Sequence, residues 1–341
     1  MNKILTIGIP TYNRCEHLKN NLRQLLPQAI LYKDQVEVVV SDNCSPDDTK
    51  SIVASFTEDY NEILIYNRNE TNEGYLFNFG KCVELSSAKY ICLIGDDDEV
   101  VYGYISTVLS MLKENDIGVL HYNFFTCSPT TNKLSAFYSN REFVSIFEYY
   151  KDSGDFIKTF LNGPSFMSSI VFKRDIWLYG KNRFEENCYG YDWLMKVYAV
   201  MKGRSCGYYS IPLVIQHISP LQPYGDLWAK YSVIGMYRIF GNLEADYPGI
   251  CDIWQNKQKH NDRLYFTLLN TYRNKKMYKG FASEMKASIA SKSQLITFYV
   301  AIFSPSVVVK YSIFPFFYTF LFFRKTLGSI VKILKRKFLN R

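Results

Sequence analysis

The amino-acid sequence predicts an α/β fold in which helices flank a mostly parallel central sheet. Within the first hundred residues, four apolar runs of strand length alternate with stretches of helical periodicity. This alternation is typical of parallel sheets with right-handed crossovers. Polar loops follow the runs, and open α/β sheets bind ligands beyond the carboxyl ends of their strands. The 341 residues, 48% hydrophobic and 21% charged, suffice for one large domain with an appendage or for two small domains.

The first strand is predicted over residues 3–9, and Pro10 ends it. After a loop over 11–14, we expect a helix from Cys15, because leucines recur on one helical face. This helix is expected to stop at Pro27, since proline lacks a backbone N–H and clashes with the preceding turn.

A second, β-branched strand is predicted over residues 36–41. In the loop that follows, residues 45–48 (Ser-Pro-Asp-Asp) suit a helix N-terminus, with a cap, a proline in the first turn and two carboxylates at the positive end of the helix dipole. Asp42 is not needed for that cap and lies at the carboxyl end of the strand, so it is a candidate ligand-binding residue.

A short third strand over 63–66, a polar loop over 67–74 and a helix over 75–86 form the next unit. The apolar residues of this helix recur at helical spacing, so it should pack on the sheet. No G-x-G-x-x-G pattern follows any of the strands, which argues against dinucleotide binding.

The fourth apolar run, residues 90–98, reads YICLIGDDD and places three carboxylates just beyond a buried strand. Adjacent carboxylates repel one another, so folding alone gives little reason for them. A hard divalent cation gives one, because Mg²⁺ and Mn²⁺ take oxygen ligands and bridge carboxylates to substrate phosphates. The alternative is an acidic turn that caps the next helix, but the position at a strand end favours the metal.

The strand pattern continues at 117–122, followed by an irregular aromatic segment and by a serine-rich loop that enters a strand over 163–172. A helix opens at Asp192, whose carboxylate either caps the helix or takes part in chemistry. A further strand over 211–217 ends in His217, which is either structural or a ligand.

The basic charge is concentrated at the C-terminus. Residues 324–341 hold seven basic and no acidic residues, so the first 323 residues account for only +1 of the net charge of +8. This distribution argues against a body that binds nucleic acid. Eight cysteines without C-x-x-C spacing indicate reduced thiols with no zinc role. The strand pattern that starts at Met1 leaves no room for a signal peptide, so we expect a cytoplasmic body.

The apolar stretch 295–323 precedes this basic tail. Pro305 and Pro315 cut it, and Lys310 lies within it, so its pieces are shorter than the roughly 20 residues that span a bilayer. Apolar pieces followed by basic residues fit helices that lie on an anionic membrane surface. The alternatives are a helical hairpin packed on the body or in a dimer interface, or one that crosses the membrane.

Six segments together carry a family resemblance: IGIPTYNR (7–14), VVVSDNCSPDDT (38–49), NEGYLFN (72–78), YICLIGDDD (90–98), GYDWL (190–194) and IPLVIQHIS (211–219). In this order they resemble family 2 glycosyltransferases with the GT-A fold, the group that includes bacterial O-antigen, capsule and other polysaccharide transferases. The resemblance covers about residues 3–220. Within that group the chain looks loosely like the abequosyltransferases.

The resemblance implies a nucleotide-sugar site at the ends of the first four strands. Tyr12 would stack on or pack near the base, Asp42 would hydrogen-bond the base or the ribose, and Gly74 would permit close backbone approach. The implied nucleotide-sugar-binding residues are Pro10, Thr11, Tyr12, Asn13, Arg14, Asp42, Asn72, Gly74, Asn78, Asp96 and Asp97.

The acidic triplet stands where the family has its D-x-D metal motif, and His217 matches a late histidine that in relatives lies near the metal or diphosphate. The chain departs from the common form L-D-x-D-D, because Gly95 takes the first aspartate position when the strands are aligned. A literal D-x-D would pair Asp96 with Asp98. We favour Asp98 and Asp97, with His217, as the implied ligands of Mn²⁺ or Mg²⁺.

Asp192 matches the catalytic base at the family's E/D-D-x-x-L helix start, although Tyr191 stands where a preceding acid is common. A carboxylate there would take the proton of the attacking acceptor hydroxyl. Ser168, Ser169 and Trp193 fall where relatives shape the acceptor site.

The predicted activity is a metal-dependent transfer of a sugar from a nucleotide-sugar donor to a saccharide acceptor, by direct displacement with inversion. Because the tail indicates a membrane surface, we expect this acceptor to be lipid-linked. The predicted parts are a GT-A catalytic domain over 1–225, a helical extension over 226–292 and a membrane-associating tail over 293–341. The protein would lie on the inner face of the cell membrane. A non-catalytic nucleotide-binding membrane scaffold is the alternative, and a nucleotidyltransferase is a weaker one.

Overall fold

The computed structural model describes residues 3–127, 131–137, 145–161, 166–180, 188, 190–217, 229–259, 268, 271, 275–289, 291–304 and 309. The chain divides into two compact units, Met1–Asn187 with Tyr191–Gln222, and Cys188–Gly190 with Pro223–Arg341. The boundary predicted at residues 225 and 226 lies outside the described residues, and the division of the second part into an extension and a tail stays a prediction.

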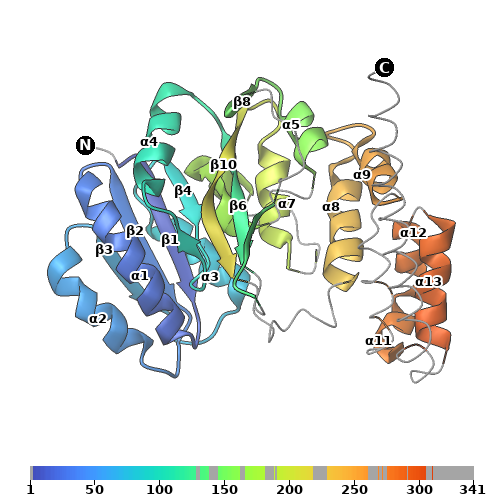
Figure 1. The fold of residues 1–341 in the computed structure, drawn as a ribbon, viewed down its shortest axis with the longest axis horizontal. Coiled ribbons are helices and arrows are strands. Elements are labelled where there is room, and N and C mark those ends of the chain that lie inside the picture. Colours follow the sequence, from blue (N-terminus) through green and yellow to red (C-terminus); the bar gives the residue numbers. More distant parts are fainter. Residues whose placement is uncertain are drawn as a thin grey trace, which may run out of the picture. The chain divides into compact units, whose positions relative to one another are not determined.

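The described residues of the first unit form a ten-stranded sheet (Figure 1), with the order β3-β2-β1-β4-β9-β6-β10-β5, β7 beside β6 and β8 beside β10. The three longest ladders, β1–β2, β2–β3 and β6–β10, are parallel, so the predicted central sheet is confirmed. The strands are β1 Leu5–Thr11, β2 Val36–Asp42, β3 Leu64–Arg68, β4 Tyr90–Leu93, β5 Glu99–Val100, β6 Val119–Cys127, β7 Leu134–Ala136, β8 Phe147–Tyr150, β9 Ile170–Lys173 and β10 Cys206–His217.

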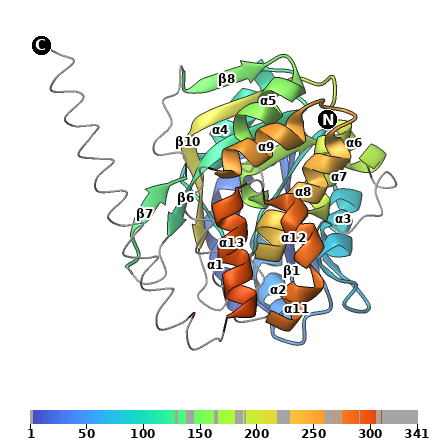
Figure 2. The same cartoon turned by 90° about the vertical axis from the view of Figure 1, so that its right-hand side faces the viewer.

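Helices cover both faces of this sheet, and α1 and α3 lie on opposite sides of β1 (Figures 1 and 2). The chain steps from β1 to β2 and β3 on one side and then returns to place β4 on the other side of β1. The strand order therefore reverses between β1 and β4, the position at which open α/β sheets bind ligands. The helices are α1 Cys15–Ala29, α2 Thr49–Tyr60, α3 Tyr75–Leu85, α4 Tyr104–Glu114, α5 Ser153–Phe160, α6 Arg174–Gly180 and α7 Asp192–Val200.

The core lies where the apolar runs of the sequence are continuous. Every residue of β2 and β4 is buried, and the leucine face of α1 packs on this core with exposures of 0–1%. The prediction that α1 stops at Pro27 is wrong, since the helix continues to Ala29. Pro27 lies in its last turn, where the buried Leu25, Leu26 and Ala29 offset the single hydrogen bond that a proline removes.

Two other segments also differ from the sequence-based expectation. The stretch after residue 124 was expected to be irregular, but β6 runs on to Cys127 and pairs with β7 and β10. The strand expected over 211–217 begins at Cys206 and passes through Pro212. Its register with β6 shifts between Tyr209 and Val214, and such a bulge accommodates a proline within a sheet.

The second unit is helical in its described part. A π-helical turn, Lys230–Gly235, leads into α8 (Met236–Leu243), and residues of this turn and of the helices from residue 275 onward contribute to a separate apolar core that includes Val233, Tyr278 and Phe298. In the described part of the chain, none of the helices combines the length and the apolar character needed to cross a membrane. The tail beyond residue 304 lies outside the described residues apart from Val309. The helices are α8 Met236–Leu243, α9 Ile250–Lys259, α11 Lys275–Gly280, α12 Ala282–Ser288 and α13 Lys292–Phe303.

Candidate active site

The reversal of strand order brings the loop after β1 against the acidic loop after β4. Thr11 Oγ1 donates to Asp96 Oδ2 at 2.8 Å. Arg14 Nη1 lies 3.1 Å from Asp96 Oδ1 and 2.8 Å from Asp97 Oδ2, so one guanidinium bridges two carboxylates. The structure thus joins four of the residues predicted to bind the nucleotide-sugar.

Asp98 turns inward, away from this bridge. Its side chain is 5% exposed, and Oδ2 accepts a hydrogen bond of 2.5 Å from Ser168 Oγ, which itself accepts from the backbone N–H of Gly95 at 2.9 Å. A Cβ at position 95 would lie 2.7 Å from Asp98 Oδ2. Glycine in place of the usual aspartate is therefore what lets Asp98 fold back over the loop.

A chain of buried hydroxyl groups supports Ser168 from behind. Tyr122 donates its hydroxyl to the Ser168 carbonyl at 2.8 Å, and the hydroxyls of Tyr104 and Tyr122 lie 2.9 Å apart. Burial raises the pKa of both phenols well above the ordinary value. They therefore stay protonated hydrogen-bonding groups beneath the acidic loop.

Negative charge exceeds positive charge at this loop. Burial raises the pKa of Asp96, with Arg14 and Thr11 acting against it. Burial and the charge of Asp97 raise the pKa of Asp98 well above the ordinary value, while the hydrogen bond from Ser168 opposes the shift. Two carboxylates share the Arg14 guanidinium and a third, Asp98, is buried in the same loop, so a bound cation would relieve the excess of acidic groups.

The donor set fits a cation that shares its ligands with a substrate. Among the described residues, no group of three or more His, Cys, Asp or Glu side chains is arranged to hold a metal ion. Asp97 is the most open of the three carboxylates, with a side-chain exposure of 20% against 7% for Asp96. Mg²⁺ and Mn²⁺ bind through one or two carboxylates together with phosphate oxygens and water, which is the arrangement that these residues allow.

His217 reaches the same loop from the end of β10. Its backbone amide favours the charged form of Asp98, and its Nε2 lies 2.9 Å from Glu99 Oε1. The antiparallel pairing of β10 with β5 produces this contact. The structure thus places His217 beside the predicted metal residues with its ring against Glu99, a residue that the sequence reasoning missed although it extends the acidic run.

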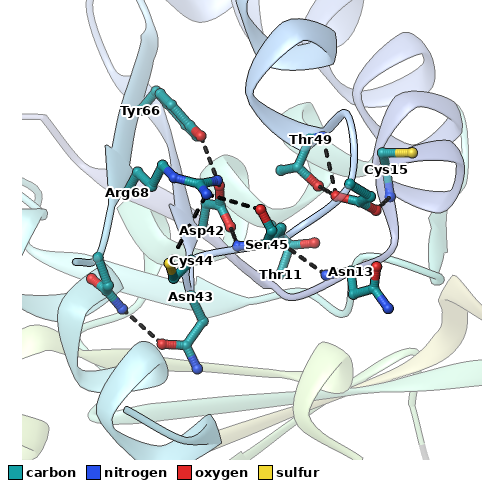
Figure 3. A network of polar contacts seen from close by, with 12 residues as sticks. Thr11, Asn13, Cys15, Asp42, Asn43, Cys44, Ser45, Thr49, Tyr66 and Arg68 are labelled. Atoms are coloured by element: carbon teal, nitrogen blue, oxygen red, sulfur yellow. Dashed lines mark hydrogen bonds and ion pairs between the residues drawn. The ribbon is translucent and has the colours of Figure 1, made fainter. Parts of the chain in front are cut away.

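Asp42 lies at the centre of a polar network at the end of β2 (Figure 3). Its Oδ1 accepts from the backbone N–H of Ser45 at 2.8 Å, and Oδ2 accepts from Tyr66 at 2.8 Å and from Arg68 Nη1 at 2.6 Å. Burial and the Asp42 carboxylate raise the pKa of Tyr66 to about 12. Asp42 is fully buried, so both of its oxygens hold the loop together. Its contact with a base or ribose stays a prediction.

The loop before α2 bonds to the start of α1 as well as to the start of α2. Ser45 Oγ accepts from the backbone N–H of Asn13 at 2.9 Å (Figure 3), and Asp47 Oδ2 accepts from the N–H of Cys15 at 2.9 Å. Helix α2 begins only at Thr49, which donates its N–H and hydroxyl to Asp47. Capping by Ser45 is therefore wrong, because its hydroxyl is engaged by the neighbouring loop.

Asparagine amides pin the loop before α3 to the ends of β1 and β2. Asn43 donates to Asn72 Oδ1 at 2.7 Å and accepts from Asn69 Nδ2 at 3.0 Å. Asn78 is 3% exposed and donates to the carbonyls of Thr11 and Ser41. In this structure the predicted ligands Asn72 and Asn78 hold the backbone, and Asn43 is a hub that the sequence reasoning missed.

The more exposed predicted residues lie around this framework. Tyr12 is 44% exposed, and the backbone of Asn13 is left-handed with φ 56°. Pro10 is the last but one residue of β1 and lies opposite Ser41. Gly74 precedes α3 with φ 84°, a conformation that favours glycine.

Asp192 is the first residue of α7, and the cap position is occupied by Tyr191. Its Oδ2 accepts a hydrogen bond of 2.5 Å from the hydroxyl of Tyr75, the first residue of α3. The predicted base therefore accepts a hydrogen bond from α3, the helix that follows the loop predicted to border the nucleotide-sugar. Tyr75 follows directly on Gly74 in the motif NEGY, but nothing in the sequence indicated its contact with Asp192.

The acceptor role expected for Ser168, Ser169 and Trp193 stays a prediction. The two serines are fully buried and Trp193 is 3% exposed, so their side chains lie within the protein. Ser168 contacts Asp98, and Ser169 donates to the carbonyl of Phe166 at 2.7 Å. Trp193 lies on the buried face of α7.

The chain matches the model of glycosyl transferase family 2 over residues 6–174. The chain belongs to this family. The matched segment includes both the loop after β1 and the acidic loop after β4, so the residues that converge in the structure lie inside it. This match confirms the family resemblance found in the sequence.

Two curated relatives are bacterial glycosyltransferases. The chain is 28% identical over 186 residues to a GalNAc(5)-diNAcBac-PP-undecaprenol beta-1,3-glucosyltransferase of Campylobacter jejuni, an alignment that covers 54% of this chain and 56% of the relative. It is 36% identical over 95 residues to the abequosyltransferase RfbV of Salmonella typhimurium, covering 28% of each. The chain thus spans about half of the first relative and less of the second.

Solved structures share the fold at low sequence identity. S. aureus TarS 1–349 in complex with UDP-GlcNAc has a TM-score of 0.58 and 16% identity, over 87% of this chain and 86% of that chain. The mannosyltransferase PcManGT from Pyrobaculum calidifontis, in complex with GDP-Man and Mn²⁺, has a TM-score of 0.52 and 15% identity, over 89% and 88%. The likeness confirms the predicted GT-A fold.

Proposed function

We propose that this glycosyltransferase moves a sugar from a nucleotide-sugar to a lipid-linked saccharide in the synthesis of a bacterial surface polysaccharide. One observation carries the proposal. The loop with Thr11 and Arg14 and the loop with Asp96 and Asp97 interlock at the reversal of strand order, where an α/β sheet binds phosphorylated ligands. TarS with UDP-GlcNAc and PcManGT with GDP-Man are known complexes of the same fold.

A divalent cation would bind at Asp97 and Asp98 together with the donor diphosphate, and when bound it would neutralise charge on the leaving group. Arg14 would add a second positive charge near the phosphates, because its guanidinium already lies 2.8 Å from Asp97 Oδ2. His217 would support the site through its backbone contact with Asp98.

Asp192 would act as the base. Its carboxylate would take the proton of an acceptor hydroxyl while that oxygen attacks the anomeric carbon of the donor sugar. The bond between the anomeric carbon and the phosphate oxygen breaks, and the nucleoside diphosphate leaves with the electron pair. Displacement from the face opposite the leaving group would invert the anomeric configuration. General-base catalysis of this kind contributes roughly 10²–10⁴-fold to the rate.

The proposed acceptor class and location are supported by the C-terminal sequence and by the relatives. Seven basic residues follow the apolar stretch 295–323, a pattern that favours a peripheral position on the inner face of the cell membrane. The Campylobacter relative is named for an undecaprenol-linked substrate. Both observations support an acceptor that is held at a membrane surface.

The test is a thermal-shift panel of UDP, GDP, CDP and dTDP, each with and without Mn²⁺. Ligands that bind the native state raise the melting temperature by mass action, so one nucleotide should give a shift that depends on the metal. Asp97→Asn should abolish this shift, whereas Asp116→Asn, at a carboxylate that is 77% exposed and paired with Lys173, should keep it.

Asp192→Asn should keep the shift and lose sugar transfer. Folded protein that responds to none of the nucleotides would contradict the proposal and favour a scaffold without activity. Normal transfer by Asp192→Asn would refute the assignment of the base alone.

A further inference from the structure

The hydrogen bond between Tyr75 and Asp192 joins two parts of the first unit that are 117 residues apart. Tyr75 opens α3, directly after the loop that is predicted to border the nucleotide-sugar. Asp192 opens α7. The distance between Tyr75 Oη and Asp192 Oδ2 is 2.5 Å, which is typical of an O–H group that donates to a carboxylate.

The Tyr75 side chain is fixed at its base. The carbonyl of Gly74 accepts from Asn43 Nδ2 at 3.3 Å, and the Gly74 N–H donates to Asn72 Oδ1 at 3.0 Å. The ring packs edge-on against Phe79 with centroids 5.6 Å apart. The ring is nevertheless 45% exposed, so it lies at the surface where an acceptor would approach Asp192.

The backbone of Asp192 is fixed by the packing of α7. The residues that follow it in α7, including Leu194 and Val197, are fully buried, which fixes the start of the helix against the core. The remaining freedom of the carboxylate is rotation about its side-chain bonds. The hydrogen bond at Oδ2 restricts that rotation.

We propose that Tyr75 is a positioning residue for the catalytic base. The inference rests on the proposed role of Asp192. A carboxylate offers about four acceptor positions on two oxygens, so a bond from Tyr75 to Oδ2 is compatible with proton transfer to Oδ1. The acceptor oxygen then forms its bond to the anomeric carbon as the nucleoside diphosphate leaves, and Tyr75 keeps its own proton throughout.

This arrangement also couples the two substrates. The Asn43–Asn72–Gly74 contacts that border the predicted donor site hold the residue that orients the base for the acceptor. A small displacement of a reacting group costs up to about a hundredfold in rate. A change in the geometry of the donor site would therefore affect the position of the base through the Tyr75 hydroxyl group.

The experiment is a double-mutant cycle of Tyr75→Phe and Asp192→Asn in the full chain. The rate is nucleoside diphosphate release from UDP-glucose, UDP-GlcNAc and GDP-mannose, measured with undecaprenyl diphosphate-linked oligosaccharides and, without acceptor, as hydrolysis. We expect Tyr75→Phe to lower kcat about tenfold with the donor KM unchanged. In the Asp192→Asn background the same change should have no effect, because the group that it positions is gone.

Tyr149→Phe is the matched control. Tyr149 is 54% exposed on β8, which pairs with the N-terminal half of β10, at the other end of that strand from His217. It should leave kcat and KM unchanged. The Mn²⁺-dependent thermal shift with UDP should be the same in all variants, which separates positioning of the base from damage to the donor site.

Two results would overturn the inference. Equal losses from Tyr75→Phe with and without Asp192 would show that the tyrosine acts independently of the base. A Tyr75→Phe enzyme with unchanged kcat, alongside an inactive Asp192→Asn enzyme, would refute the positioning role and leave the proposed function intact. Full activity of Asp192→Asn would instead refute the base, and the positioning role with it.

Discussion

Replacing Gly95 by alanine tests how the acidic loop is built. An alanine Cβ would lie 2.7 Å from Asp98 Oδ2 and 3.2 Å from Asp97 Oδ1, whereas ordinary contacts begin near 3.4 Å. The Asp98 carboxylate would have to move by about 0.7 Å, which breaks its short hydrogen bond with Ser168. Overpacking costs about 1–3 kcal/mol, and a buried polar group that loses its hydrogen-bond partner costs about 1–3 kcal/mol. Because the two effects overlap, we expect a loss of about 3 kcal/mol.

The assay is urea unfolding of the purified protein, with Gly80→Ala as the control. Gly80 lies inside α3, where an added Cβ would meet its nearest atoms, in Trp177, at 3.8 and 3.9 Å. Alanine is favoured over glycine in a helix by about 1 kcal/mol, so this control should be neutral or stabilising. Gly95→Ala should also weaken the Mn²⁺-dependent thermal shift with nucleotide. If Gly95→Ala were as stable as Gly80→Ala, the inward placement of Asp98 would be wrong.

Two further predictions concern polar contacts of single side chains. Ser168→Ala should cost about 2 kcal/mol of unfolding free energy and weaken Mn²⁺ binding measured by electron paramagnetic resonance, whereas Ser169→Ala, which removes a hydrogen bond to a backbone carbonyl, should leave Mn²⁺ binding unchanged. Equal Mn²⁺ affinities in the two variants would contradict the role of Ser168. Burial opposes ionisation of Asp47, but hydrogen bonds from Thr49 and Cys15 outweigh it and lower the pKa of the carboxyl. A lowered pKa in the folded state means that the stabilisation is complete above the unfolded value of about 3.9 and is lost as the pH falls through the folded value. Asp47→Ala should therefore cost about 1 kcal/mol at pH 7, and its difference from the wild type in urea unfolding should shrink below about pH 4; a constant difference would refute the pairing.

The parts of the fold that the sequence predicts are those encoded by local patterns. The apolar runs of β1, β2 and β4 are continuous in the sequence and buried in the structure. Since parallel strands share one carboxyl edge, Thr11 and the acidic triplet could be placed together before any coordinates. The end of α1 was predicted wrongly at Pro27, because tertiary packing outweighs the low helix propensity of proline there and that packing is not visible in the sequence.

The direction in which site residues point was beyond the sequence. Ser168, Asn78 and Asp98 have the residue types of ligands, but each points into the protein, and their burial depends on strands distant in the chain. The contacts of Tyr75 with Asp192 and of Glu99 with His217 join segments more than a hundred residues apart. No spacing rule connects such pairs. They arise only when the sheet order is known.

The contacts around Asn43 are neutral hydrogen bonds, whereas those around Arg14 are ion pairs. The loop that leads to α3 is tied down by amide groups, which carry no charge. Salt screens interactions between exposed charges over about 10 Å at 0.1 M but leaves such neutral contacts unaffected. These asparagine contacts should therefore persist across a wide range of ionic strength. The pairing of Arg14 with Asp97, the more exposed of its two partners, should in contrast loosen as salt rises, so that ionic conditions would tune the proposed contact with the diphosphate and leave the asparagine contacts unchanged.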